Sequence, residues 1–288
     1  MRDLQRAAGH PDRITAVAYS QLSAWLRTAD SQVLAKDCPL NDYDALLVRA
    51  MPAASLEQIV FRMNALAQLE SNGLVVVNPA RSLEVAIDKY LALARLRQAG
   101  FKIPETMVCQ NATLAMKAFA TLGGDVVVKP LFGGEGRGML RICEEALALR
   151  SFKTLEQLGA VIYVQQFVPH QGEDWRLLVI GDRVLGMKRQ NPDDWRTNIS
   201  LGATSRPLLV TPELETMAIR ASKAVGASIA GVDFLPARDG DLYALEVNAV
   251  PGWKALAATL ETDVAQIVLN HITSLVTRPD CDSQICHN

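Results

Sequence analysis

Two acidic residues face each other across a predicted β-hairpin near the C-terminal end of the chain. The apolar runs 230–235 and 242–247 flank Asp239-Gly240, and Asp-Gly between such runs is a strong hairpin signal. Centring the turn there sets Asp233 opposite Glu246, where Cβ atoms lie only about 4.5 to 5.5 Å apart and like charges repel. Any fold that contains this hairpin must compensate the repulsion. The pairing therefore constrains the fold and points to a bound cation.

A third oxygen-bearing side chain accompanies the two carboxylates. Asn248 lies two residues beyond Glu246, so strand alternation places it on the same face. Magnesium is usually held by one or two carboxylates, with water and substrate phosphates in the other positions. Asp233 and Glu246 could instead lie on a solvated face or pair with arginines, but the apolar Leu235 shares their face. The sequence favours a divalent metal site at Asp233, Glu246 and Asn248.

A glycine-rich segment joins two predicted strands in the middle of the chain. Residues 126–139 read VVVKPLFGGEGRGM, which matches neither a Walker A loop nor a dinucleotide fingerprint. The glycines at positions 133, 134, 136 and 138 leave backbone N–H groups free to surround an anion. An ordinary glycine-rich hairpin turn would look similar. Together with the acidic hairpin, the segment indicates a mobile phosphate-binding loop to which Lys129 adds positive charge.

Basic side chains collect on another predicted hairpin and on the segment after it. Gly181-Asp182 joins two runs that carry Arg176, Lys188 and Arg189. A solvated basic face would explain these three residues. Phosphoryl transfer would explain them equally, because it demands cations and N–H donors around developing negative charge. Arg196 and Asn198, two residues apart in an extended segment, could contact one phosphate together.

Three successive patterns predict three parts of the chain. In residues 12–80, short apolar runs alternate with an amphipathic helix, which is typical of a Rossmann-like α/β domain. Residues 81–164 begin with a linking helix and continue as a small α+β lid domain that carries the glycine-rich segment. Residues 165–277 predict an antiparallel-sheet domain with the metal site. The polar tail 278–288 is predicted to be flexible.

Local signals fix several elements of the first two parts. Strands are predicted at residues 14–19, 45–48 and 74–77. A helix over 55–70 begins with a capping box formed by Ser55 and Gln58. One linking helix is predicted over 82–98; it carries Asp88 and Lys89.

Composition excludes several classes of function. Of the 288 residues 49% are apolar and 21% charged, so the chain should fold. A net charge of −2 gives no global field for nucleic acid or anionic membranes. No apolar run is long enough to span a bilayer, and we expect a cytoplasmic protein. The five cysteines are scattered, as in a reducing compartment. Cys281, Cys286 and His287 cluster in the tail without a fourth zinc ligand.

The motifs resemble, in order and spacing, the ATP-grasp superfamily and within it the RimK-like carboxylate-amine ligases. The resemblance covers about residues 74–272. It rests on Asp88-Lys89, Val128-Lys129-Pro130 with the glycine loop, Gln165 to Val168 followed by Gly172 to Arg176, Met187 to Arg189, Arg196 to Asn198, Gly231 to Asp233, and Glu246 to Asn248 followed by Pro251-Gly252. Residues 48–63 also resemble the branch that adds α-linked glutamate to tetrahydromethanopterin-type coenzymes.

The resemblance implies an ATP-dependent ligase that forms an amide through an acyl phosphate and releases ADP and phosphate. It assigns Arg189, Arg196 and Asn198 to catalysis. It implies a nucleotide and phosphate site formed by Lys89, Lys129, Gly133, Gly134, Gly136, Gln165, Gln166, Phe167, Val168, Asp174, Arg176, Lys188 and Thr197. Within this set, Gln165 to Val168 receive adenine and Asp174 the ribose. Asp233, Glu246 and Asn248 would bind one or two Mg²⁺, with Mn²⁺ as an alternative. Gln166 replaces a glutamate of many relatives and carries no charge.

The implied partners are ATP, a small-molecule carboxylate acceptor and an amino acid, glutamate in the first place; a homo-oligomer is compatible with these features. Arg49 and Arg62 could recognise an acidic substrate or be ordinary charges, and the second interpretation is favoured for Arg62. A small-molecule kinase with the same ATP cleft and a non-catalytic nucleotide-binding module are the alternative functions. The sequence does not determine the acceptor, the number of residues added or the oligomeric state.

Overall fold

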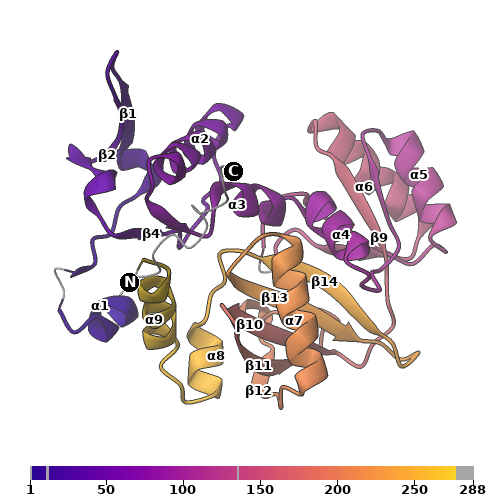
Figure 1. Cartoon of the computed structure of the whole chain (residues 1–288). Coiled ribbons are helices and arrows are strands. Elements are labelled where there is room, and N and C mark those ends of the chain that lie inside the picture. The colour runs from indigo at the N-terminus through magenta and orange to yellow at the C-terminus, as the bar shows by residue number, and fades with distance from the viewer. Residues whose placement is uncertain (1, 11–12, 135, 277–288) are drawn as a thin grey trace, which may run out of the picture.

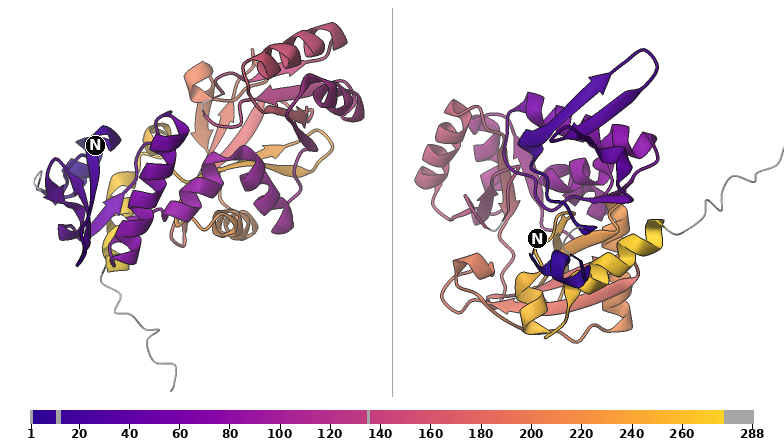
Figure 2. Two further views of the ribbon diagram at one scale, coloured as in Figure 1. Left: turned by 90° about the horizontal axis from the view of Figure 1, so that it is seen from above. Right: turned by 90° about the vertical axis from the view of Figure 1, so that its left-hand side faces the viewer.

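The structure is a computed structural model that describes residues 2–10, 13–134 and 136–276. Cys281, Cys286 and His287 lie outside these residues. Figures 1 and 2 show the chain in three regions: N-terminal strands with helix α2 (Leu56–Ser71), a middle region with α5 (Ala112–Thr121) and α6 (Glu145–Gln157), and a C-terminal sheet.

The N-terminal region combines an antiparallel sheet with a parallel strand pair. Strands β1 (Leu22–Leu26), β2 (Ser31–Ala35) and β3 (Cys38–Pro39) pair in that order, and the β1–β2 hairpin stands out from the body (Figure 1). Strands β4 (Ala45–Leu47) and β5 (Val75–Val77) pair in parallel. Helix α2 connects them and begins with the predicted capping box at Ser55. This βαβ unit is the Rossmann-like element of the fold.

The strand predicted at residues 14–19 is wrong. Residues 14–18 have no regular structure and residues 15–18 are exposed. A short 3-10 helix, Tyr19–Gln21, follows, and β1 begins at Leu22. An apolar run predicts a strand only when another strand pairs with it and a core covers it. Among the residues that the structure describes, no strand pairs with residues 14–18, and of these five only Ile14 packs against a core.

The linking segment consists of two helices instead of the predicted one. Helix α3 (Ala80–Ile87) ends at Asp88, and α4 (Lys89–Gln98) begins after it. The Asp88 side chain accepts hydrogen bonds from the backbone N–H groups of Tyr90 and Leu91, at 2.9 and 3.2 Å. Aspartate is a preferred N-cap residue, and the apolar periodicity concealed this signal. The break places Lys89 in the first turn of a helix.

The middle region is an antiparallel sheet with two helices on one face. The strand order is β6-β9-β7-β8. The strands are β6 (Thr106–Cys109), β7 (Val126–Lys129), β8 (Leu140–Ile142) and β9 (Ile162–Gln166). Val126, Ile162 and Val164 form a core with α5 and α6. Alternation turns Lys129, Tyr163 and Gln165 to the opposite face.

The C-terminal region is an antiparallel sheet covered by helices on both faces. The strand order is β12-β11-β10-β13-β14. The strands are β10 (Glu173–Ile180), β11 (Arg183–Gln190), β12 (Thr204–Pro207), β13 (Ile229–Pro236) and β14 (Leu242–Asn248). Helix α7 (Pro212–Ala224) packs on one face (Figure 1). Helices α8 (Lys254–Thr259) and α9 (Val264–Val276) pack on the other, against Leu178, Ile180 and Met187.

The β13–β14 hairpin pairs Asp233 with Glu246, as the sequence predicted. The turn itself differs from the expectation. Leu235 pairs with Tyr243, one residue away from the register of a turn centred on Asp239-Gly240. A β-bulge beside Asp233 restores the expected register at the two acids. The one-residue shift at the turn and the one-residue shift at the bulge therefore cancel at Asp233 and Glu246.

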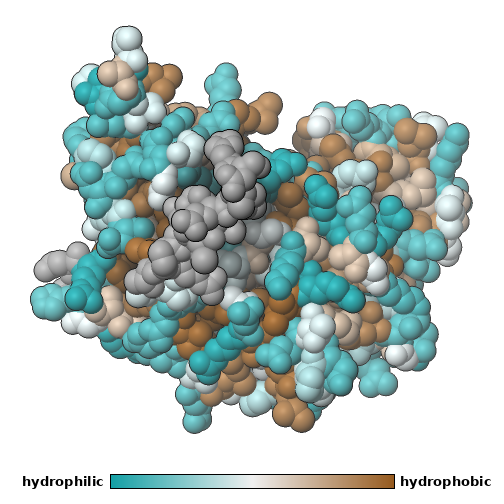
Figure 3. Space-filling model, in the orientation of Figure 1, coloured by the Kyte–Doolittle hydropathy of each residue, from teal (hydrophilic) through white to brown (hydrophobic). Residues whose placement is uncertain are grey.

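Hydrophilic and hydrophobic residues are interspersed over the face drawn in Figure 3. Within the described ranges, no helix is both long and apolar enough to cross a membrane.

Candidate active site

Four charged side chains form one ionic network on a single face of the C-terminal sheet. Asp174 lies opposite Arg189, and Arg176 lies opposite Asp233. The Arg189 guanidinium donates to both Asp174 oxygens at 2.7 and 2.6 Å, and its Nη2 lies 3.0 Å from Asp233 Oδ2. Arg176 Nη1 donates to Asp233 Oδ1 at 2.6 Å. These four residues are called the ionic network below.

Burial and pairing shift the pKa values of the network in opposite directions. Burial by itself would raise the pKa of Asp233, but the charges of Arg176 and Arg189 outweigh it and lower that pKa. Burial raises the pKa of Asp174 in spite of Arg189. Burial would lower the pKa of Arg189, yet Asp233 and Asp174 raise it. The guanidinium groups therefore keep Asp233 ionised.

The ribose contact expected for Asp174 is not compatible with this arrangement. Asp174 is only 3% exposed, and Thr197 Oγ1 donates to it at 2.6 Å beside the two Arg189 bonds. Thr197 is buried as well, so its expected nucleotide contact is also absent here. Both residues hold Arg189 in place instead of facing an open site. The sequence motif identified Asp174 and Thr197 as site residues but did not predict that they hold Arg189.

Two lysines lie beside the glycine-rich loop, as expected. Lys89 Nζ donates to the Gly133 carbonyl oxygen at 2.6 Å. Lys129 Nζ donates to Gln165 Oε1 at 2.5 Å. Burial lowers the pKa of both ammonium groups, that of Lys129 to about 8, and the carboxylate of Glu246 acts against this shift in each case. Both lysines are thus near enough to Glu246 to share one electrostatic site.

The glycine loop also reaches the segment that carries Arg196 and Asn198. A Cβ added to Gly136 would lie 2.5 Å from Asn198 Oδ1, and the Gly136 φ is +72°. A side chain is excluded there on both counts. The structure therefore brings together the loop and Asn198, which are far apart in the sequence.

The expected metal ligands form a set of hard oxygen donors. Asp233 and Glu246 are paired across the hairpin, and Asn248 follows on β14. Asp233 pairs with arginines, the alternative left open by the sequence, whereas Glu246 has no ion pair with any described residue. The Asn248 amide oxygen accepts from Val250 N at 2.8 Å. The described residues hold no cluster of three His, Cys, Asp or Glu side chains suited to a metal. Two carboxylates and an amide nevertheless fit magnesium.

Lys188 does not face the ionic network. Its neighbour Arg189 belongs to the network, so strand alternation turns Lys188 to the other face of the sheet. There its Nζ lies 3.2 Å from Glu173 Oε1 and 5.5 Å from the centre of the Trp175 ring. The sequence prediction was wrong because it treated adjacent strand residues as sharing one face.

Arg196 is held within its own loop. Its guanidinium donates three hydrogen bonds to Asp194, the shortest at 2.6 Å. A phosphate contact would require this pair to open. Arg196 also lies 5.9 Å from the centre of the Trp195 ring. In this conformation the Arg196 guanidinium is bound to Asp194 and is therefore not available for the catalytic contact that the sequence predicts.

The residues expected to receive adenine, Gln165 to Val168, differ in their exposure. Gln165 and Val168 are buried, and Gln166 is exposed. The Phe167 ring lies under the Arg141 guanidinium at 3.4 Å and edge-on to Trp195 at 6.0 Å. These three residues line a cavity of about 540 Å³. Arg141 escaped sequence analysis; its alternation with the buried Ile142 on β8 was the available signal.

Asn78 is a second residue that sequence analysis missed. It is 1% exposed. Its Nδ2 donates to the carbonyl oxygens of Ile229 and Ala249, both at 2.6 Å. Its Oδ1 accepts from Ser228 N and Ile229 N, at 2.8 and 3.0 Å. It thus joins the end of β5 to β13 and to the residue after β14, the two strands that carry the expected metal ligands. A polar residue directly after an apolar run was the available signal.

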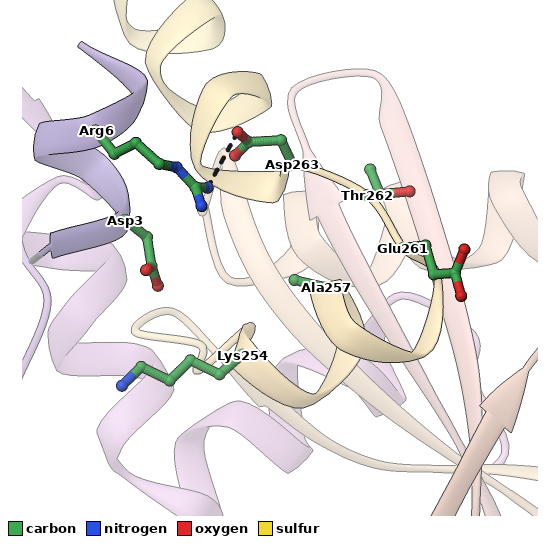
Figure 4. A pocket seen from close by; sticks show the side chains of 7 residues that line it. All are labelled: Asp3, Arg6, Lys254, Ala257, Glu261, Thr262 and Asp263. Atoms are coloured by element: carbon green, nitrogen blue, oxygen red, sulfur yellow. Dashed lines mark hydrogen bonds and ion pairs between the residues drawn. The ribbon is translucent and has the colours of Figure 1, made fainter. Parts of the chain in front are cut away.

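A separate surface pocket lies between helix α1 (Arg2–Ala7) and the C-terminal helices (Figure 4). Its volume is about 390 Å³, and Arg6 Nη2 lies 3.1 Å from Asp263 Oδ2 at its edge. None of the residues expected from the sequence to form the site lines this pocket.

Fold and site together define an ATP-grasp protein. Residues 86–272 match the RimK-like ATP-grasp domain family. The chain belongs to this family, and it is an ATP-dependent carboxylate-amine ligase. Ligases of this kind use ATP with Mg²⁺. The alternative of a kinase or a non-catalytic module is not favoured.

Named relatives match over most of the chain. A tetrahydromethanopterin:alpha-L-glutamate ligase of Methanosarcina acetivorans is 28% identical, covering 91% of this chain and 90% of the relative. A "Probable alpha-L-glutamate ligase" of Xanthomonas campestris pv. campestris is 31% identical, covering 94% and 92%. The solved ATP-grasp ligase PsnB, complexed with a minimal precursor, has a TM-score of 0.71 at 21% identity, covering 95% and 93%. The D-alanine–D-alanine ligase of Bacillus anthracis has a TM-score of 0.59 at 18% identity, covering 73% of each chain.

Proposed function

We propose that this ligase joins the amino group of L-glutamate to a carboxylate of a small-molecule acceptor through an acyl phosphate, releasing ADP and phosphate. One observation carries the proposal. Lys89, Lys129 and Glu246 interact electrostatically beside the glycine loop, and Glu246 pairs with Asp233 of the ionic network. The relatives named as alpha-L-glutamate ligases support glutamate as the amine.

In the first step a carboxylate oxygen of the acceptor attacks the γ-phosphorus of ATP, and the bond from that phosphorus to the β,γ-bridging oxygen breaks. Lys89 and Lys129 bind the phosphates and offset the charge that develops on ADP. The Gly133, Gly134 and Gly136 loop closes over them and excludes water, which would hydrolyse the acyl phosphate. Arg196 reaches the γ-phosphate once it leaves Asp194.

Asp233, Glu246 and Asn248 would hold one or two Mg²⁺, with Mn²⁺ as a substitute. When bound, the cation neutralises phosphate oxygens and polarises the γ-phosphoryl group. Arg176 and Arg189 keep the Asp233 carboxylate ionised and oriented, with Asp174 and Thr197 behind Arg189. The Asn248 amide oxygen accepts one hydrogen bond, from Val250 N, and its second lone pair is left for the cation.

In the second step the glutamate amine attacks the acyl carbonyl carbon, the carbon–oxygen bond to phosphate breaks, and the amine loses a proton. Asn198 donates to the tetrahedral oxyanion in this proposal, and its position beside the loop at Gly136 supports that role. A pterin-type coenzyme is the first acceptor to consider, because one named relative acts on tetrahydromethanopterin. A peptide carboxylate is the second.

Product analysis tests this function. The enzyme is incubated with ATP, Mg²⁺, each amino acid in turn and a panel of acceptors: tetrahydromethanopterin, short peptides and simple dicarboxylates. Mass spectrometry should find an acceptor heavier by one or more glutamyl residues, with ADP and phosphate in equal amounts. AMP as product would indicate adenylation, and a released phosphorylated acceptor would indicate a kinase. The same preparation, analysed by sedimentation, gives the oligomeric state.

A further inference from the structure

Arg49 is a cation at the site that no described carboxylate neutralises. It follows β4 by two residues and is exposed. Its guanidinium lies over the Trp253 ring at 3.5 Å, and its Nη1 donates to the Pro251 carbonyl oxygen at 3.0 Å. Among the residues that the structure describes, no acidic side chain lies within ion-pair distance of it. Although the residue as a whole is exposed, neighbouring groups desolvate its guanidinium and lower the pKa of Arg49 to about 10.

The position of Arg49 is fixed relative to the expected metal ligands. Asn78, at the end of β5, binds the Ala249 carbonyl oxygen, and Arg49, just beyond the end of β4, binds that of Pro251. Both contacts are to the segment that directly follows Asn248. The carboxyl ends of the parallel strands thus meet the exit of the metal-bearing strand β14. Ligands of α/β proteins commonly bind at that edge of a parallel sheet.

Three other arginines that the sequence assigned to the site are already engaged. Arg176 and Arg189 bind acids of the ionic network, and Arg196 binds Asp194. A guanidinium has five N–H donors, and Arg49 uses one of them on a carbonyl. Arg49 stacks on Trp253, and within the described ranges no acceptor other than the Pro251 carbonyl oxygen is bonded to its N–H groups. The edge of a guanidinium matches a carboxylate, which can accept two parallel hydrogen bonds.

We propose that Arg49 binds a substrate carboxylate on the side of the site that the N-terminal region forms. The carboxylate considered first is one of the incoming glutamate. This inference rests on the proposed function. The lysines and the glycine loop serve the nucleotide, so the segment after Asn248 is left for the amine substrate and the acceptor. Arg49 is thus a residue for substrate specificity, selecting acidic over neutral amines. The other source of the same chemistry is a second carboxylate of the acceptor.

The test is a comparison of KM values in Arg49→Gln. L-glutamate, isoglutamine, whose α-carboxylate is an amide, and glutamine, whose γ-carboxylate is an amide, are used as amines at saturating ATP and acceptor. We expect KM for glutamate to rise about 10- to 100-fold with kcat little changed, as for loss of a charge-assisted hydrogen bond. In one of the two amides, the carboxylate that Arg49 recognises is replaced. That amide should already have the raised KM with the wild-type enzyme, and its KM should not rise further with Arg49→Gln. Arg49→Lys should recover part of the loss.

Arg62→Gln is the matched control. Arg62 also lies over an aromatic ring, that of Tyr19 at 4.9 Å, and donates to a proline carbonyl oxygen, that of Pro52 at 2.9 Å. It is buried, 9% exposed. We expect Arg62→Gln to lower the melting temperature without changing either KM. A general packing defect in Arg49→Gln would instead lower kcat and the melting temperature together.

Each outcome decides one question. A rise in KM for the acceptor alone would mean that Arg49 binds a carboxylate of the acceptor and not one of glutamate. Unchanged KM values for both substrates in an Arg49→Gln enzyme whose wild type forms product would overturn the Arg49 assignment and leave the ligase reaction intact. No amide product from the wild type with any amino acid would overturn the proposed function and this inference with it.

Discussion

At the scale of single residues, the site depends on whether each acid is paired. Asp233 bonds to two arginines, whereas Glu246 has no ion pair with a described residue. Both are expected to serve the metal, yet their removal should affect folding differently, because an unpaired buried charge is costly and a relieved repulsion is not. Replacing each carboxylate by its amide can therefore separate the effect on turnover from the effect on folding stability.

Glu246→Gln should reduce turnover by at least about 100-fold with a free energy of unfolding within about 1 kcal/mol of the wild type. Asp233→Asn should reduce turnover as strongly and lower the free energy of unfolding by about 2 to 4 kcal/mol, since Arg176 loses its charged partner and Arg189 loses one of two. Urea denaturation and a coupled ADP assay measure the two quantities. Full activity in both variants would contradict the metal assignment.

Lys129 predicts a pH dependence. Its pKa is lowered from 10.5 to about 8, so the free enzyme loses this positive charge as pH rises through about 8. Because kcat/KM reports the free enzyme, kcat/KM for ATP should fall above that pH. The unfolded chain binds the proton up to about pH 10.5, so this lysine makes stability rise with pH between the two values.

The measurement is kcat/KM for ATP from pH 6.5 to 9.5. Lys129→Gln is the control: it should bind ATP more weakly and show no decline near pH 8. An identical decline in wild type and variant would assign the titration to another group.

At the scale of elements, the break between α3 and α4 places Lys89, which is proposed to bind phosphate. Asp88→Ala removes the side-chain cap of α4 and should cost about 1 kcal/mol of stability. Because Lys89 is the first residue of that helix, KM for ATP should also rise. Asn111→Ala, which removes the cap of α5, should cost similar stability and leave KM unchanged. Equal KM values in the two variants would show that the cap serves folding only.

At the scale of the whole molecule, Asn78 couples the N-terminal region to the metal-bearing strands. Asn78→Ala removes its five hydrogen bonds and leaves backbone carbonyl and N–H groups at the start of β13 and just after β14 without these partners. We expect a loss of about 3 kcal/mol or more in unfolding free energy. Hydrogen exchange of Ile229 and Ser228 should accelerate, with kcat reduced. Unchanged protection of these amides would contradict the coupling.

The sequence by itself determined what depends on short distances along the chain. Helix α2 with its Ser55 cap and both hairpins follow from local periodicity and turn chemistry, whereas Asp233 meets Glu246 because a bulge offsets the one-residue shift at the turn. These interactions join residues a few positions apart, so their signals are complete within a window. The order of the motifs also identified the family.

Tertiary structure alone decided which charges meet. It turned Lys188 away from the site, placed Asp174 behind Arg189 and not at a ribose, and paired Asp233 with two arginines. It also brought Asn78 and Arg49 to the exit of β14. Each of these contacts depends on which strands are neighbours and which face is covered. Those are properties of the assembled sheets, where burial sets the strength of every ion pair, and no local pattern encodes them.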